Sequence, residues 1–136
     1  MHQIKLNFNT RGKDLLEITG ELVTEIRELK LPSAGMLNLY IQHTSASLII
    51  QENADRSAKD DLLAFYERLV PDNQSWHRHT AEGPDDTTAH MRSSLGSTSL
   101  NIPIYQGELA LGIWQGIYIF EHRNGIHRRS LLATIW

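Results

Sequence analysis

The sequence predicts a single α+β domain in which a largely antiparallel β-sheet packs with two to three helices. Three observations favour this class. Apolar residues recur at helical spacing in the middle of the chain. Segments that alternate apolar and polar residues, as half-buried strands do, occupy both ends. The length of 136 residues suits one domain, residues 1–136, and a hydrophobic content of 40% is enough for a core.

The N-terminal part of the chain is expected to form strands around one helix. HQIKLNF (2–8) alternates as a strand does, and a short strand can follow the turn at Arg11-Gly12. The segment TGELVTEIRELKL (19–31) carries apolar residues at helical spacing, with Thr19 as a candidate N-cap. The apolar stretches 36–41 and 46–50 then predict two strands, or one bent strand, joined at the HTS sequence.

The clearest helix is predicted within NADRSAKDDLLAFYERLVP (53–71). Asn53 or Asp55 can cap its start, and Pro71 ends it. Its apolar residues form one stripe, which predicts a buried face made of Ala58, Leu62, Phe65, Tyr66 and Leu69. A short helix is expected next, beginning at Asp85 or Asp86 and ending at Gly96.

The C-terminal part predicts four strands: TSLNIPIY (98–105), GELALGIW (107–114), GIYIFEHR (116–123) and IHRRSLLATIW (126–136). The pair Asn124-Gly125 is a strong signal for a two-residue hairpin joining the last two strands. Trp114 is interpreted as a core residue.

Composition and charge exclude several classes of function. The formal net charge is −3, which argues against nucleic-acid binding through a broad basic field. The absence of cysteine excludes disulfides, iron–sulfur clusters and thiol nucleophiles. No segment has the apolar length of a membrane span, and the N-terminus lacks the apolar region of a secretory signal. We therefore expect a cytoplasmic protein with neither nucleic-acid nor membrane partners.

The first candidate site lies in HTSASLIIQENAD (43–55). His43 and Ser45 would share one strand face, while Glu52, Asn53 and Asp55 sit where that strand passes into a helix. Strand ends and helix N-termini expose polar groups that suit anions and phosphates. The simpler alternative is an exposed strand followed by an ordinary cap.

The second candidate site is HTAEGPDDTTAH (79–90). Asp86 and His90 stand at i, i+4 and can meet on one helix face, with His79 in the preceding loop. A carboxylate bonded to one imidazole nitrogen makes the other nitrogen more basic, which suits a metal ligand or a general base. The spacing matches no established zinc motif. The simpler alternative is a solvated acidic loop.

The third candidate site is GIWQGIYIFEHR (112–123). Alternation places Gln115, Glu121 and Arg123 on one strand face. Arg123 could hold a phosphate bidentately. The simpler interpretation is a surface ion pair between Glu121 and Arg123.

These three segments, together with DDLLAFYERLVP (60–71), resemble the YjbQ-like family of small bacterial and archaeal proteins. The resemblance extends from about Arg11 to the C-terminus. The resemblance implies the α+β fold of that family and assembly as a homotrimer. It also implies secondary thiamine-phosphate synthase activity, which couples hydroxymethylpyrimidine diphosphate to a thiazole phosphate and releases pyrophosphate. The pocket that it implies gathers His43, Glu52, Asp55, His79, Asp86, His90 and either Glu121 or His122.

Two classes of function follow from these residues. The first is an enzyme acting on a small phosphorylated metabolite, assisted by Zn, Mg or Mn, with a metal-dependent hydrolase as a variant that uses the same residues. The second is a non-catalytic homotrimer that binds a metal or a phosphorylated metabolite. The expected catalytic residues are His43, Glu52, Asp86 and His90. The expected substrate-binding residues are Ser45, Asn53, Asp55, Gln115, Glu121 and Arg123, and the expected metal ligands are His43, His79 and His90.

Overall fold

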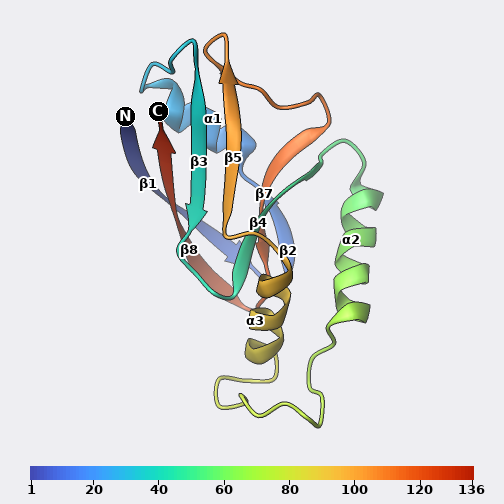
Figure 1. The fold of residues 1–136 in the computed structure, drawn as a ribbon. Coiled ribbons are helices and arrows are strands. Elements are labelled where there is room, and N and C mark those ends of the chain that lie inside the picture. The colour runs from blue at the N-terminus through green and yellow to red at the C-terminus, as the bar shows by residue number, and fades with distance from the viewer.

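The computed structural model describes residues 1–136 as a single α+β domain with two antiparallel sheets and three helices (Figure 1). The five-stranded sheet has the order β1 (His2–Arg11), β8 (Ile126–Ile135), β3 (Ala34–Ile41), β5 (Ser99–Tyr105) and β6 (Glu108–Leu109). The three-stranded sheet has the order β2 (Asp14–Glu17), β7 (Gln115–Glu121) and β4 (Ala46–Glu52). The helices are α1 (Thr19–Arg27), α2 (Arg56–Leu69) and α3 (Asp86–Leu95), and none is long and apolar enough to cross a membrane.

The main core lies between the two sheets and is closed by α1. Ile117 and Ile119 of β7 face this core, as their alternation predicts, and α1 adds Leu22 and Ile26. The opposite face of β7 carries Tyr118 and Phe120, which pack against Tyr66 of α2. The three-stranded sheet is therefore covered on one side by the larger sheet and on the other by α2.

The predicted hairpin at Asn124-Gly125 is wrong. β7 pairs with β2 and β4, whereas β8 pairs with β1 and β3, so this turn carries the chain from one sheet to the other. Gly125 adopts a φ of 82°, and its carbonyl accepts a hydrogen bond from the Gly12 N–H at 2.7 Å, in the similar crossing between β1 and β2. A turn signal predicts a local change of direction and does not decide which strand becomes the partner.

Several local predictions also need correction. Thr19 does not cap α1. It is the first helical residue, and its hydroxyl accepts the Ile117 N–H at 2.9 Å. Trp114 is exposed, since strand structure in its segment is confined to Glu108–Leu109. Of the predicted stripe on α2, Tyr66 is buried but Phe65 and Leu69 are more than half exposed. One helix lying on a three-stranded sheet meets too little surface to cover the whole stripe. Asp55 does cap α2, accepting the Ser57 N–H at 2.8 Å.

A buried histidine next to β7 predicts a pH-dependent stability. His122 is fully buried, and burial lowers its pKa to about 3. In the unfolded chain this histidine binds a proton near pH 6.5, whereas in the folded chain it stays neutral down to about pH 3. Its contribution to the free energy of unfolding is therefore fully present above about pH 6.5 and is lost as the pH falls toward about 3. Between pH 7 and pH 5 we expect the free energy of unfolding to fall by about 2 kcal/mol from this group.

Urea denaturation of metal-free protein at a series of pH values measures this effect. His122→Gln removes the titrating ring and should flatten the pH dependence of the unfolding free energy, even though the variant itself is less stable because of lost packing. An equally steep dependence in the variant would contradict the assignment to His122.

Candidate functional site

The short helix α3 is fixed in place by a buried arginine. Arg92 is 2% exposed and donates from Nε and Nη2 to the Val70 carbonyl just beyond α2, at 3.1 and 2.8 Å. Its Nη1 lies 3.2 Å from Glu67 of α2. The end of α2 therefore holds the helix that carries the candidate site. Sequence reasoning missed Arg92, because an arginine in a short polar helix shows no pattern that separates an anchor from a solvated side chain.

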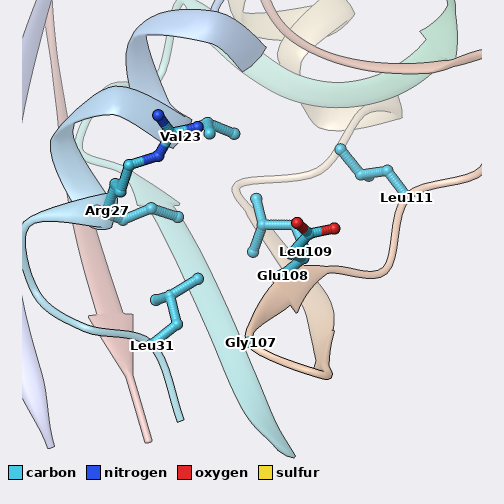
Figure 2. Close-up of a pocket in the computed structure, with 8 residues that line it drawn as sticks. Val23, Arg27, Leu31, Gly107, Glu108, Leu109 and Leu111 are labelled. Carbon is cyan, nitrogen blue, oxygen red and sulfur yellow. The ribbon is translucent and has the colours of Figure 1, made fainter. Parts of the chain in front are cut away.

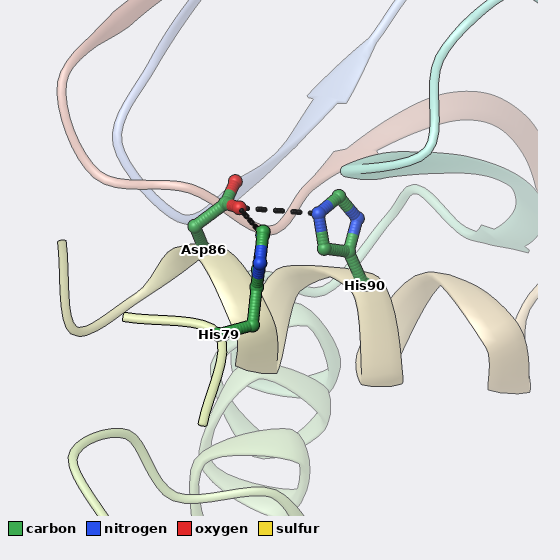
Figure 3. Close-up of side chains that lie close together, drawn as sticks. All are labelled: His79, Asp86 and His90. Atoms are coloured by element: carbon green, nitrogen blue, oxygen red, sulfur yellow. Dashed lines mark hydrogen bonds and ion pairs between the residues drawn. The ribbon is translucent and has the colours of Figure 1, made fainter. Parts of the chain in front are cut away.

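Two histidines and one aspartate meet at the start of α3 (Figure 3). The Nε2 atoms of His79 and His90 lie 2.7 and 3.1 Å from the same oxygen, Asp86 Oδ2. One ligand atom of each residue lies within 4.8 Å of the others, which is close enough for a shared metal ion. The Asp86 side chain is 3% exposed, whereas those of His79 and His90 are 54% and 39% exposed. We call these three residues the His–Asp–His group.

The other ring nitrogen of His90 determines the tautomer of the ring. Nδ1 lies 3.0 Å from the carbonyl oxygen of Thr44, in the connection between β3 and β4. A carbonyl oxygen only accepts, so Nδ1 carries the hydrogen. In neutral His90 the Nε2 lone pair then points at the Asp86 carboxylate, and two acceptors face each other unless a proton or a cation lies between them. A backbone carbonyl that fixes the far nitrogen in this way is typical of metal-binding histidines.

Arg123 contacts the Asp86 carboxylate through the oxygen that the two histidines do not contact. Its Nη1 lies 3.2 Å from Asp86 Oδ1, its Nε 3.4 Å from Asp85 Oδ2, and its Nη2 donates to the Glu82 carbonyl at 3.0 Å. Burial acts to raise the pKa of Asp86, but hydrogen bonding with Glu82 and His79, together with the nearby Arg123 charge, outweighs it and holds the pKa below its usual range. Two ionised aspartates against one guanidinium leave the site negative, which favours a cation.

Asp85 helps to hold Arg123 in place against Asp86. Its Oδ2 accepts the Asn124 N–H at 2.9 Å in addition to its contact with Arg123. Burial acts to raise its pKa as well, but these two interactions outweigh burial and lower the pKa. Arg123 was expected to bind a substrate phosphate. In the structure its guanidinium is occupied by Asp85, Asp86 and Glu82, so it positions the carboxylate.

His43 does not join the His–Asp–His group. Its Nε2 accepts the Ser130 N–H of β8 at 2.8 Å. A backbone N–H only donates, so Nε2 is unprotonated and the ring hydrogen is on Nδ1. Burial and the positive charge of Arg129 lower the pKa of His43, which keeps the ring neutral. The structure thus brings together His79, Asp86 and His90, whereas sequence reasoning expected His43, His79 and His90 as metal ligands.

The predicted residues at the far end of β4 lie apart from this group. The pairing of β4 with β7 sets Glu52 opposite Gln115 and Ala46 opposite Glu121. Six residues of strand separate these two ends, about 20 Å. Asn53 and Asp55 follow Glu52 and border a separate shallow polar pocket with Lys59 and Tyr118. One pocket that joins Glu52, Asn53, Asp55 and Gln115 with the two histidines is therefore not formed within this chain.

Glu121 lies near the candidate site but is buried in a different network. It is 1% exposed, and its oxygens lie 2.7 and 2.6 Å from Arg129 Nε and Nη2. The Thr10 hydroxyl donates to it as well. Burial acts to raise the pKa of Glu121, but hydrogen bonding to Arg129 and Thr10 outweighs burial and lowers the pKa. The simpler alternative for Glu121, a surface pair with Arg123, is wrong, because the partner of Glu121 is Arg129 on β8 of the facing sheet.

Glu121 also supports the backbone that leads to Arg123. Its Oε2 accepts the N–H groups of His122 and Arg123 at 3.0 and 3.1 Å. The adjoining residue Ser45 is buried, and its carbonyl accepts the His122 N–H at 3.2 Å. Both residues therefore shape the site from within the protein instead of facing a ligand.

A separate apolar cavity of about 370 Å³ lies between α1 and β6 (Figure 2). Its apolar lining residues are Val23, Ile26, Leu31, Leu109 and Leu111, and Arg27 and Glu108 border it. It contains no histidine and shares no residue with the His–Asp–His group.

Comparisons with known proteins place the chain in a family. The model of the family described as UPF0047 protein YjbQ-like matches residues 2–136. A UPF0047 protein of Synechocystis is 41% identical, with 98% of this chain and 90% of the relative aligned. The UPF0047 protein YjbQ of Escherichia coli O157:H7 is 36% identical, with 98% and 96% aligned.

Solved structures have the same fold. A crystal structure of an uncharacterised conserved protein of the YjbQ/UPF0047 family from Clostridium acetobutylicum is 30% identical, covers 98% of this chain and 99% of that chain, and has a TM-score of 0.85. A hypothetical protein from Aeropyrum pernix, at 23% identity, has a TM-score of 0.89 over 100% of this chain and 98% of its own, which supports the fold alone. With the family model matched along nearly its whole length, this chain belongs to the UPF0047 YjbQ-like family.

Proposed function

We propose that the protein is a metal-assisted enzyme that acts on a small phosphorylated metabolite at the His–Asp–His group. One observation carries this proposal. Two imidazole Nε2 atoms converge on one carboxylate oxygen, and the Nδ1 of His90 is already committed to the Thr44 carbonyl. Such an arrangement gathers two imidazole nitrogens and a carboxylate oxygen at one place, as a cation site requires.

The exposure of the group favours catalysis over a purely structural role. Both histidine side chains are partly open to solvent, while Asp86 lies beneath them. Three protein ligands with an open side are characteristic of catalytic metal sites, whereas structural zinc sites are usually closed by four. A bound divalent cation would supply Lewis-acid stabilisation of phosphate oxygens. Arg123 would keep Asp86 oriented, and the Thr44 carbonyl would keep His90 in the required tautomer.

The chemical step belongs to one of two classes. The pyrophosphate-releasing coupling that forms thiamine phosphate needs positive charge at the departing oxygens, and a cation at the group would provide it. Hydrolysis of a phosphate ester needs the same charge, with water as nucleophile. A non-catalytic protein that binds a metal or a phosphorylated metabolite is the alternative.

Metal analysis with activity assays tests this proposal. Protein purified without chelator and dialysed against Zn²⁺, Mn²⁺ or Mg²⁺ should retain about one ion per chain, and a chelator should lower its melting temperature. Metal-loaded protein should then turn over either the coupling substrates or a phosphate ester, and metal-free protein should not. Retained metal without turnover of any of these substrates would favour the binding-protein alternative. No retained metal would overturn the proposal.

We also propose that the chain assembles as a homotrimer. An apolar patch beside the site, formed by Leu69, Trp76 and Leu95, is more than half exposed at each of these residues. Apolar surface of this kind on a small domain is a common mark of an interface. Light scattering of the same sample should give three times the mass of the chain, and a monomer would contradict the assembly.

A further inference from the structure

A surface depression of about 510 Å³ adjoins the His–Asp–His group and shares His90 with it. It has no apolar lining residue, and it is formed by His43, Thr44, His90, Ser93, Ser94 and Thr98. Small-molecule sites of this size are usually lined by apolar side chains. Carbon atoms of these side chains form most of its surface, but each of the six residues also carries a hydrogen-bonding group, so a ligand can be held here by hydrogen bonds.

The depression carries no fixed positive charge. No lysine or arginine lines it. Arg129, whose charge lowers the pKa of His43, is buried and bonded to Glu121. His43 itself is neutral, because its Nε2 accepts the Ser130 N–H. A phosphate bound in the depression alone would meet no cation, so an anionic group is better placed at the metal.

The hydrogen-bonding groups in the depression are mixed. His43 Nδ1–H and the hydroxyls of Thr44 and Thr98 have no protein partner and can donate to a ligand. The hydroxyl protons of Ser93 and Ser94 are already donated to the carbonyls of Ala46 and Met91, so those two oxygens can only accept. Phosphate oxygens would be repelled by such acceptors. Hydroxyl groups, which donate and accept, match both kinds of partner.

We propose that this depression binds the hydroxyl-bearing part of a sugar phosphate whose phosphate is held at the His–Asp–His group. The proposal rests on the metal site of the preceding section and specifies its substrate class. Thr98 and Ser94 are the specificity-determining residues, since each offers a hydroxyl oxygen to the ligand while lying outside the metal group.

Calorimetric titrations test the proposal with four probes: Zn²⁺ alone, then inorganic phosphate, D-ribose and D-ribose 5-phosphate added to zinc-loaded protein. We expect D-ribose 5-phosphate to bind at least about tenfold more tightly than inorganic phosphate, because several hydroxyl contacts add to the phosphate contact. Thr98→Val and Ser94→Ala should each lower the affinity for D-ribose 5-phosphate about fivefold, the usual effect of one lost hydrogen bond. Neither variant should change the affinity for Zn²⁺ or inorganic phosphate.

The arms of this experiment distinguish the two proposals. Thr24→Val removes a hydroxyl that donates to the Gly20 carbonyl on α1 and serves as the matched control, with unchanged binding of all four probes. If Zn²⁺ does not bind, the metal site fails and the substrate class fails with it. If Zn²⁺ and phosphate bind but D-ribose 5-phosphate binds no more tightly than phosphate, only the depression is overturned. The depression is likewise overturned as the binding site if Thr98→Val and Ser94→Ala both leave the preference for D-ribose 5-phosphate over inorganic phosphate unchanged.

Discussion

Replacing His90 by alanine should weaken zinc binding roughly 100-fold or more, and Asp86→Asn should have a comparable effect. Loss of an outer partner of a metal ligand typically costs 10–100-fold in affinity, and loss of a ligand itself should cost at least the upper end of that range. His90 contributes one of the converging Nε2 atoms, and Asp86 contributes the oxygen on which they converge. Competition with a chromophoric zinc chelator measures the affinity of each variant.

Two other histidines serve as controls for this experiment. His2→Ala changes an exposed residue at the start of β1 and should leave zinc affinity unchanged. His43→Ala should change it by no more than about twofold, because His43 Nε2 is bonded to Ser130 and lies outside the group. Each variant should first show a cooperative unfolding transition. A strong loss in His43→Ala with little change in His90→Ala would show that the metal site is the one expected from sequence, and that our assignment is wrong.

The substitution Arg129→Met should destabilise the fold by about 3–5 kcal/mol. It removes the partner of a carboxylate that is almost completely buried and leaves the charge of Glu121 uncompensated, which is the costly way to break a buried ion pair. Thr10 and two backbone N–H groups remain bonded to Glu121, but none of them carries a positive charge. Urea denaturation at pH 7 gives the change in the free energy of unfolding.

A double variant separates the ion pair from simple loss of packing. Glu121→Gln combined with Arg129→Met removes both charges, and its destabilisation should be clearly smaller than the sum of the two single effects. Lys59→Met is a control of similar chemistry, since Lys59 pairs with Asp14 in a partly exposed bridge and should cost no more than about 1 kcal/mol. Strictly additive single effects would show that Glu121 and Arg129 act independently.

The sequence was sufficient for the α+β class, for the three helices and for most strands. Local sequence patterns predict these features: the spacing of apolar residues in α1 and α2, the alternation of apolar and polar residues in β5, β7 and β8, and the Asp55 cap. The i, i+4 spacing of Asp86 and His90 likewise predicted their contact, because helix geometry alone brings such residues together. Local pattern therefore determined the elements and half of the candidate site.

Strand partners and long-range contacts were decided by the tertiary structure. The turn at Asn124-Gly125 was a sound local signal, yet β7 and β8 belong to different sheets because each finds its partners far away in the chain. Glu121 was expected at the surface beside Arg123, but the packing of the two sheets places Arg129 of β8 against it. Alternation assigns a residue to a face of its strand and does not reveal which element covers that face.

The division of the candidate site has the same physical origin. His43 and Glu52 are close in sequence, but an extended strand carries them to opposite ends of the sheet. The roles of His43 and His90 depend on their partners, a backbone N–H of β8 for one and the Thr44 carbonyl for the other. Backbone N–H and carbonyl groups are nearly the same at every residue, so the sequence does not indicate which of them a histidine will contact. Only the folded chain decides which ring nitrogens carry a hydrogen, and hence which histidine can bind a metal.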